Sequence, residues 1–165
     1  MRTIKLYIAG KVSKNSFFGT HYWRDDIVAT LSQLTDYSFD LLDPTRTGID
    51  QSDPMTVFQN DCRLIQACDL FFVYLSDDIS VGGSQEILIA KYLQKPVIGL
   101  APRGGKFNGS TKEFFGQVVK DYKDPFVFST CDFVCETIDE VAATIDGALT
   151  IQPKTLAIID DALQA

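Results

Sequence analysis

Histidine, basic residues and long apolar runs are scarce in this sequence. One histidine occurs in 165 residues, and 15 Lys and Arg against 22 Asp and Glu give a formal net charge of −7. Nucleic-acid grooves and anionic membrane surfaces both require a basic protein face, so this acidic balance argues against either partner. No stretch approaches the ~20 apolar residues of a transmembrane helix, and Gly10 ends the first apolar run too early for a signal peptide. We therefore expect a cytoplasmic protein with no nucleic-acid and no membrane partner.

The cysteines lack the spacing of a metal site or of a disulfide framework. None of the four, Cys62, Cys68, Cys131 and Cys135, forms a Cys-x-x-Cys pair. With a single histidine, a zinc site built from His and Cys is also disfavoured. A chain of this length with 45% hydrophobic residues can bury a sizeable core without cross-links. We expect reduced, mostly buried thiols and no metal.

Strand-like and helix-like segments alternate along the whole chain. We expect strands at Thr3–Ala9, Tyr37–Leu42, Asp69–Leu75, Pro96–Leu100 and Phe126–Ser129. We expect helices at Trp23–Leu34, from Asp53-Pro54 onward, at Ser84–Leu93, from Ser110 or Thr111 to Tyr122, at Thr137–Leu149 and at 154–163. This order predicts a single-domain α/β fold: a doubly wound, parallel, five-stranded sheet in a flavodoxin- or Rossmann-like three-layer sandwich. The domain spans 1–150, and 151–165 form a C-terminal tail or short helix.

In such folds, ligands bind at the carboxyl ends of the strands, near the switch in strand order. Two carboxylates lie in the helices that precede and follow the third expected strand. Asp61 lies in the helix before the third strand, and Glu86 lies in the first turn of the helix after it, just behind the glycines Gly82 and Gly83. Glycines let the backbone approach a ligand, and the partial positive charge of a helix N-terminus stabilises an anion. Glu86 is therefore a candidate nucleophile, or else an ordinary first-turn glutamate.

The segment from Asp61 to Val97 resembles the core of the nucleoside 2-deoxyribosyltransferase family, which includes the related 2'-deoxynucleoside 5'-monophosphate N-hydrolases. The matching positions are Asp61, Asp69, Gly82, Glu86, Ala90 and Lys95-Pro96-Val97. The first strand, LYIAG, also resembles that of the family and places Tyr7 where the family has a tyrosine beside its nucleophile. In all, the resemblance covers roughly residues 4–101.

The resemblance implies a mechanism. Glu86 would attack the anomeric carbon as the base leaves, giving a glycosyl-enzyme ester that a second base then resolves. Tyr7 would hydrogen-bond Glu86, and Asp61 would protonate or hydrogen-bond the leaving base, which requires a raised pKa. The implied partners are a small-molecule nucleoside or nucleotide, a free nucleobase and further copies of the chain in a dimer or higher homo-oligomer. No metal or organic cofactor is implied, because carboxylates suffice for this chemistry.

One position departs from the transferases. Many of them carry an Asp six residues before the nucleophile, whereas this chain has Ser80 there, as the N-hydrolases do. In those enzymes the hydroxyl helps to bind a 5'-phosphate; the alternative is an ordinary loop serine. The loop after the first strand bears on the same question, since Lys11, Ser13, Lys14, Ser16 and Gly19 would suit a phosphate. It lacks the P-loop pattern, and it reads equally as a solvated loop.

Other substrate-binding candidates lie along the same edge. Gly10 ends the first strand, and Asp43 opens the loop that follows the second. Trp23 and Arg24 resemble a Trp-Arg pair of several family members and would add stacking and charge near the substrate. Alternatively, Trp23 packs on the sheet and Arg24 faces solvent. His21 is more typical of an incidental surface histidine, and the loop 102–110 is either a lid or a plain connection.

The leading hypothesis is an enzyme that moves deoxyribose between nucleobases. The alternative within the family is a (deoxy)nucleoside 5'-monophosphate N-glycosidase that passes the sugar to water. The stretch VGGSQE also has a faint similarity to the GGxGTxxE signature of cytokinin-activating phosphoribohydrolases, although the preceding Pro and the Thr are missing. A non-enzymatic alternative is a nucleotide-sensing domain, because fold alone does not determine function.

Overall fold

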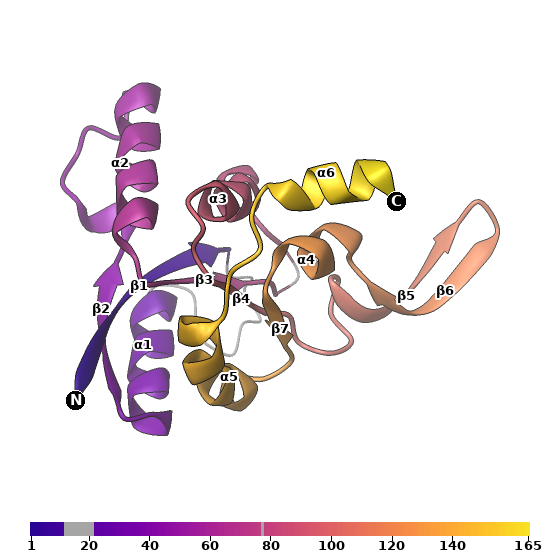
Figure 1. Cartoon of the computed structure of the whole chain (residues 1–165), viewed down its shortest axis with the longest axis horizontal. Coiled ribbons are helices and arrows are strands. Elements are labelled where there is room, and N and C mark those ends of the chain that lie inside the picture. The colour runs from indigo at the N-terminus through magenta and orange to yellow at the C-terminus, as the bar shows by residue number, and fades with distance from the viewer. Residues whose placement is uncertain (12–21, 77) are drawn as a thin grey trace.

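A twisted parallel sheet with helices on both faces forms the body of the protein (Figure 1). The computed structural model describes residues 1–11, 22–76 and 78–165. Its elements are β1 (Arg2–Gly10), α1 (Trp23–Leu34), β2 (Tyr37–Leu42), the 3-10 turn η1 (Pro44–Arg46), α2 (Pro54–Ala67), β3 (Leu70–Tyr74), α3 (Val81–Tyr92), β4 (Val97–Leu100), β5 (Asn108–Phe114), β6 (Gln117–Lys123), α4 (Pro125–Thr130), β7 (Phe133–Cys135), α5 (Ile138–Thr150) and α6 (Ala157–Gln164).

The main sheet has the strand order β2-β1-β3-β4-β7, and all of its pairs are parallel. Strand β1 lies between β2 and β3, so the chain direction across the sheet reverses there. This arrangement confirms the predicted doubly wound, five-stranded sheet. It also places the switch point, where such folds bind ligands, at the carboxyl ends of β1 and β3.

Two apolar cores lie on the two faces of the sheet. The side chains of Ile4, Leu6 and Ile8 point to one face, where they pack with α1 and α5. Tyr7 and Ala9 point to the other, where they pack with residues of α2, α3 and α4. Because side chains alternate along a strand, Tyr7 is aimed at the helices that flank the switch point. All five residues of β3 are buried, as expected for a central parallel strand.

The start of α2 and the last short helix are as predicted. Asp53 caps α2 by accepting a hydrogen bond from Met55 N at 3.2 Å, and Pro54 is the first helical residue. The four cysteines are free thiols, and three of them are buried. A last short helix, α6, follows Pro153. Within the described residues, no helix has both the length and the apolar character to cross a membrane.

The predicted strand at Phe126–Ser129 is wrong, because this segment is the helix α4. Asp124 accepts hydrogen bonds from Phe126 N and Val127 N, both at 3.0 Å, and Pro125 is the first helical residue. The apolar run was too short to separate a strand from a helix by periodicity, whereas the Asp-Pro start decides for a helix. The fifth strand of the sheet is β7, a few residues later.

The predicted helix from Ser110 or Thr111 to Tyr122 is also wrong. These residues form the antiparallel hairpin β5–β6, which projects from the body at the right of Figure 1. Its two-residue turn consists of Phe115 and Gly116, with φ values of 50° and 85°. The aromatic and β-branched residues on either side of that turn favour strands over a helix.

The apolar residues of α2 are mostly not buried. Of Val57, Phe58, Cys62, Leu64 and Ile65, only Ile65 is fully buried, and Phe58 remains 56% exposed. The upper part of α2 extends beyond the sheet in Figure 1, so the first turns of the helix have no strand beneath them. Those turns instead border a cavity.

Candidate active site

The site is centred on a hydrogen bond between β1 and α3. Tyr7 Oη donates to Glu86 Oε2 at 2.9 Å. The Tyr7 ring is fully buried and stacks on Phe71, with ring centroids 5.3 Å apart. Burial, together with the negative charge of Glu86, raises the pKa of Tyr7 well above its ordinary value. The tyrosine therefore stays protonated and remains a hydrogen-bond donor to the glutamate.

Asp61 and Glu86 line the same cavity, which has a volume of about 390 Å³. Burial raises the pKa of Glu86; the hydrogen bond from Tyr7 opposes this shift, Asp61 adds to it, and Arg24 opposes it. Burial also raises the pKa of Asp61, against an opposing hydrogen bond from Asn60 at 3.2 Å and the charge of Arg24. A pair of desolvated carboxyl groups in one cavity favours splitting their roles, one ionised and one protonated.

The start of α3 differs from the prediction. The helix begins at Val81, three residues before the expected Ser84, so Glu86 lies in its second turn and not its first. Ser80 is the N-cap and accepts a hydrogen bond from Gly83 N at 3.0 Å. The helix N-terminus therefore acts on Glu86 less than expected, since its field falls off within the first turn.

Three glycines lie at or next to the site, and Gly82 lines the cavity itself. A Cβ built at Gly82 would lie 3.6 Å from Glu86 Oε1, so the missing side chain leaves this oxygen accessible. A Cβ at Gly83 would lie 3.0 Å from Ser80 Oγ and would disturb the cap. Gly10 has φ of 131°, and a Cβ there would lie 2.4 Å from the carbonyl oxygen of Tyr74. Only glycine fits at Gly10, where β1 and β3 approach each other at the switch point.

Trp23 and Arg24 open α1. Trp23 is buried in the core, with its ring 6.1 Å from that of Tyr74, which matches the alternative that it packs on the sheet. Arg24 does not face solvent: Nε donates to Ile8 O at 2.9 Å, and the guanidinium lies 4.4 Å from the Trp23 ring centroid. The charge of Arg24 partly opposes the rise that burial causes in the pKa of both cavity carboxyls.

Asp43 is buried at the end of β2 and holds the following turn. It accepts hydrogen bonds from Thr45 N at 2.8 Å and from Thr45 Oγ1 at 2.6 Å. It also pairs with Arg46 at 3.4 Å and with Arg24 at 4.0 Å. Asp43 lines a separate polar cavity of about 180 Å³ with Trp23, Arg24 and Arg46. The structure thus places Trp23, Arg24 and Asp43 together, beside the carboxylate cavity and not within its walls.

Sequence reasoning missed much of the cavity wall. The additional lining residues are Gln51, Pro54, Val57, Phe58, Gln85 and Ile89. Helical spacing was the available signal. Pro54, Val57 and Phe58 precede Asp61 by seven, four and three residues, while Gln85 and Ile89 flank Glu86. Spacings of three, four or seven residues place a side chain on the same face of a helix as the carboxylate, whereas Gln85, directly before Glu86, does not follow from such a spacing.

Part of the predicted site lies outside the described residues, namely Ser13, Lys14, Ser16, Gly19 and His21. Lys11 is described, and its Nζ pairs with Asp78 Oδ2 at 2.8 Å. In the 102–110 loop, Arg103 pairs with Asp121 and Glu136, each at 3.2 Å. Among the described residues, no cluster of His, Cys, Asp or Glu is suited to a metal ion.

Comparison with solved structures finds the same fold in two 2-deoxyribosyltransferases and in a conserved protein. A 2-deoxyribosyltransferase from Bacillus psychrosaccharolyticus aligns with a TM-score of 0.58 and 18% identity, over 90% of this chain and 98% of that one. A 2-desoxiribosyltransferase from Leishmania mexicana aligns with a TM-score of 0.54 and 16% identity, over 87% and 97% of the two chains. A conserved protein from Enterococcus faecalis V583 aligns with a TM-score of 0.60 and 18% identity, over 88% and 98%. No protein-family model and no curated protein sequence matches the chain. These likenesses confirm the fold that the sequence resemblance implied.

Proposed function

We propose that this chain cleaves the N-glycosidic bond of a nucleoside or nucleotide and transfers the sugar to a second base, with Glu86 as the nucleophile. The observation that carries the proposal is the Tyr7–Glu86 hydrogen bond of 2.9 Å at a cavity that Asp61 also lines. The shared fold with two deoxyribosyltransferases supports it. The motif resemblance from Asp61 to Val97 supports it independently.

The proposed first step uses both carboxyl groups. A Glu86 oxygen bonds to the anomeric carbon, the bond from that carbon to the base nitrogen breaks, and Asp61 gives its proton to the departing base. Oε1 is the better placed oxygen, since Oε2 accepts the hydrogen bond from Tyr7 and Gly82 leaves Oε1 uncovered. The carboxylate charge also stabilises the cationic sugar of the transition state.

In the second step, a nitrogen of the acceptor base attacks the anomeric carbon, and the ester bond to Glu86 breaks. Asp61, now ionised, takes the proton that the acceptor loses. Both groups return to their starting states, so one carboxyl must begin ionised and the other protonated. Burial is the largest influence on both carboxyls and raises the pKa of each, and the charge of Arg24 opposes the shift in both. Glu86 accepts a hydrogen bond from Tyr7 and Asp61 accepts one from Asn60, so each carboxyl also has one donor that favours its ionised form. We assign the ionised state to Glu86 because the nucleophile must be a carboxylate, and the proton to Asp61.

A hydrolase of 5'-monophosphates is the second candidate, and Ser80 favours it. As N-cap, the Ser80 oxygen accepts from Gly83 N, and its own hydroxyl proton is available to a phosphate oxygen. The ion pair between Lys11 and Asp78 disfavours a strongly basic phosphate site, because Asp78 already neutralises the charge of Lys11. In the hydrolase, water would replace the acceptor base in the second step.

The test is a panel of deoxynucleosides and their 5'-monophosphates, each incubated with and without a second free base. Liquid chromatography would separate the products. A new nucleoside that forms only with added base is the expected result. Free base released from monophosphates regardless of acceptor would establish the hydrolase instead. Ligand binding without turnover of any substrate would contradict both and favour a sensor.

We also propose that the working form is a homo-oligomer. The carboxylate cavity is bordered by Phe58, whose side chain stays 56% exposed within one chain. Exposed apolar side chains at the rim of a polar site are typical of surfaces that a partner covers.

A further inference from the structure

The β5–β6 hairpin has little to pack on within its own chain. Its two strands contact each other extensively and make few contacts with the other described elements. Its base is nevertheless fixed: Asn108 Nδ2 donates to Ala101 O at 3.0 Å, and Arg103 pairs with Asp121 at 3.2 Å. An isolated two-stranded ribbon is only marginally stable in water. A firmly held but uncovered ribbon indicates a surface that is covered by another molecule.

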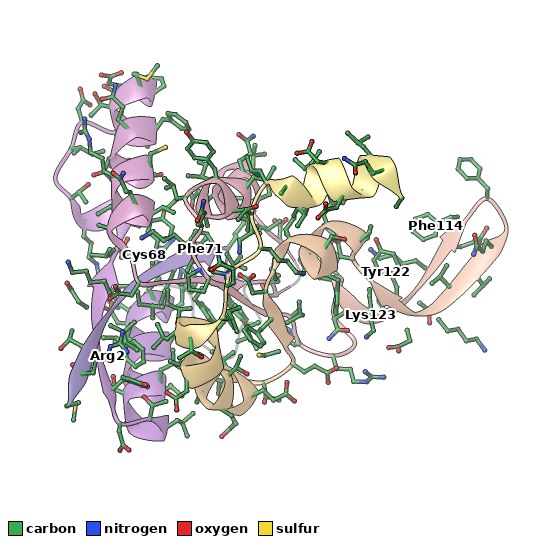
Figure 2. All side chains as sticks on the ribbon, viewed as in Figure 1. Arg2, Cys68, Phe71, Phe114, Tyr122 and Lys123 are labelled. Carbon is green, nitrogen blue, oxygen red and sulfur yellow. The ribbon has the colours of Figure 1, made fainter. Side chains whose placement is uncertain are left out.

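The tip of the hairpin carries two unfavourable features at one residue. Phe115 is fully exposed, and its φ of 50° lies in the left-handed region that bulky residues avoid. Turns of this kind prefer Asn or Gly at that position. The neighbouring Phe114 packs on Tyr122, with ring centroids 5.9 Å apart, and Figure 2 shows both side chains on the hairpin. Phe115 has no such partner among the described residues, so its exposure and strain favour a role in binding.

A groove that fits such a side chain lies between α4 and α6. It has a volume of about 450 Å³ and mostly apolar walls, formed by Leu88, Phe126, Ile158, Ile159, Ala162 and Leu163. Two of these wall residues, Phe126 and Leu163, are themselves about four-fifths exposed, at 80% and 81%. An aromatic ring placed between them would remove apolar surface from water on both sides.

We propose that the hairpin is an arm that docks on a second copy of this chain, with Phe115 seated in the α4–α6 groove of that copy. Both complementary surfaces exist on one molecule, so two copies related by a two-fold axis exchange arms and satisfy both contacts. The charges agree with this pairing. The arm carries Lys112, Lys120 and Lys123 against Glu113 and Asp121, a net charge of +1, whereas α6 carries Asp160 and Asp161 and no basic residue. In a chain of net charge −7, a weakly basic arm that meets an acidic helix reduces the repulsion between copies.

The test is the molar mass in solution, from light scattering during size-exclusion chromatography. The wild type is expected at twice the chain mass of 18.3 kDa. Phe115→Ser and Leu163→Ser should each weaken the dimer at least about tenfold, as loss of a central apolar anchor does. Tyr92→Ser is the control, because Tyr92 is an aromatic on α3 that is 71% exposed and does not line the groove. Circular dichroism should show all three variants folded.

Mixing distinguishes this docking from any other dimer. Phe115→Ser keeps an intact groove, and Leu163→Ser keeps an intact arm, so a mixed pair retains one of the two contacts. An equimolar mixture should therefore regain dimer at a concentration where each variant alone is monomeric. A monomeric wild type would overturn the proposal. So would a Phe115→Ser variant that dimerises normally, or a mixture that stays monomeric. None of these outcomes depends on the proposed enzymatic activity.

Discussion

Helix α3 carries two buried ionisable side chains, Lys91 and Glu86, and their charges differ in how completely they are paired. Lys91 is fully buried near the amino ends of the strands and pairs with Asp132, itself 2% exposed. Asp132 also accepts hydrogen bonds from Val97 N and Lys154 N, both at 2.7 Å. Every charge in this cluster has a close partner.

Glu86, five residues earlier, is less completely compensated. Within the described residues its hydrogen-bond partner is Tyr7, and the second carboxyl group of its cavity, Asp61, opposes its ionisation. Removing one partner of a fully paired buried charge destabilises the fold, so such a cluster has a structural role. A buried charge with few partners has a perturbed pKa, which is typical of functional sites. We therefore expect the Lys91–Asp132 cluster to stabilise the fold, and we propose the chemistry for the Glu86 cluster.

Replacing the proposed nucleophile should have the largest effect. Glu86→Gln keeps the shape of the side chain but removes the carboxylate, so on the proposed mechanism we expect kcat to fall at least about 10⁴-fold. Product chromatography measures this loss, with the variant's fold checked by circular dichroism. Mass spectrometry of acid-quenched wild type should show a sugar adduct on the peptide with Glu86. An active Glu86→Gln enzyme, or a sugar adduct on another residue, would contradict the proposal that Glu86 is the nucleophile.

Removing Asp132 from the other cluster should destabilise the fold without changing the residues of the carboxylate cavity. Asp132→Ala leaves Lys91 buried and unpaired, and we expect the free energy of unfolding to fall by about 3–5 kcal/mol. Urea denaturation followed by circular dichroism measures it. The double variant Lys91→Met, Asp132→Ala should recover part of the loss, because the buried charge is then gone. If Asp132→Ala matched the wild type in stability, the cluster would have no structural role.

Removing the tyrosine hydroxyl should have a smaller effect with a characteristic pH dependence. Tyr7→Phe deletes a hydrogen bond to a charged group, and a loss of about 10- to 100-fold in kcat/KM is expected. That hydrogen bond lowers the pKa of Glu86, so without it the pKa rises and the acidic limb of the kcat/KM profile moves to higher pH.

Tyr37→Phe is the matched control for that experiment. Tyr37 also hydrogen-bonds a carboxylate, Asp146, but it lies on β2, away from the carboxylate cavity. Its replacement should leave both the rate and the pH profile unchanged. An unshifted acidic limb in Tyr7→Phe would mean that the tyrosine does not influence the ionisation of Glu86.

The two regions also differ in how far the sequence alone could predict them. The parallel sheet, Asp61, Tyr7 and Glu86 lie where regular patterns apply, namely continuous apolar strands and a motif of fixed spacing. The Tyr7–Glu86 contact joins residues 79 positions apart, and it followed from the resemblance rather than from periodicity. The Lys91–Asp132 cluster was not predicted, because nothing in the local sequence marks a lysine as buried.

The segment from Asn108 to Thr130 was misassigned for physical reasons. Phe115 in a left-handed turn breaks the preference for Asn or Gly, so the hairpin had no recognisable turn signal. The helix α4 is only six residues long, too short for a helical period to appear. The start of α3 was placed late because Gly82 and Gly83 are poor helix formers, yet the Ser80 cap holds them in the first turn.

The smallest expected effect bears on the comparison most directly. If Glu86 is under-compensated, its charge destabilises the fold, and Glu86→Gln should be more stable than the wild type at neutral pH by about 1 kcal/mol. The sign follows from its pKa, which burial raises in the folded state. Folding then favours the protonated form, so the gain is present above the folded pKa. It disappears as pH falls below the ordinary value of 4.5, where both states are protonated.

Urea denaturation at neutral and acidic pH measures the gain, with the exposed Glu113→Gln as a control that should change nothing. A Glu86→Gln variant less stable than wild type at neutral pH would show that the site is compensated after all.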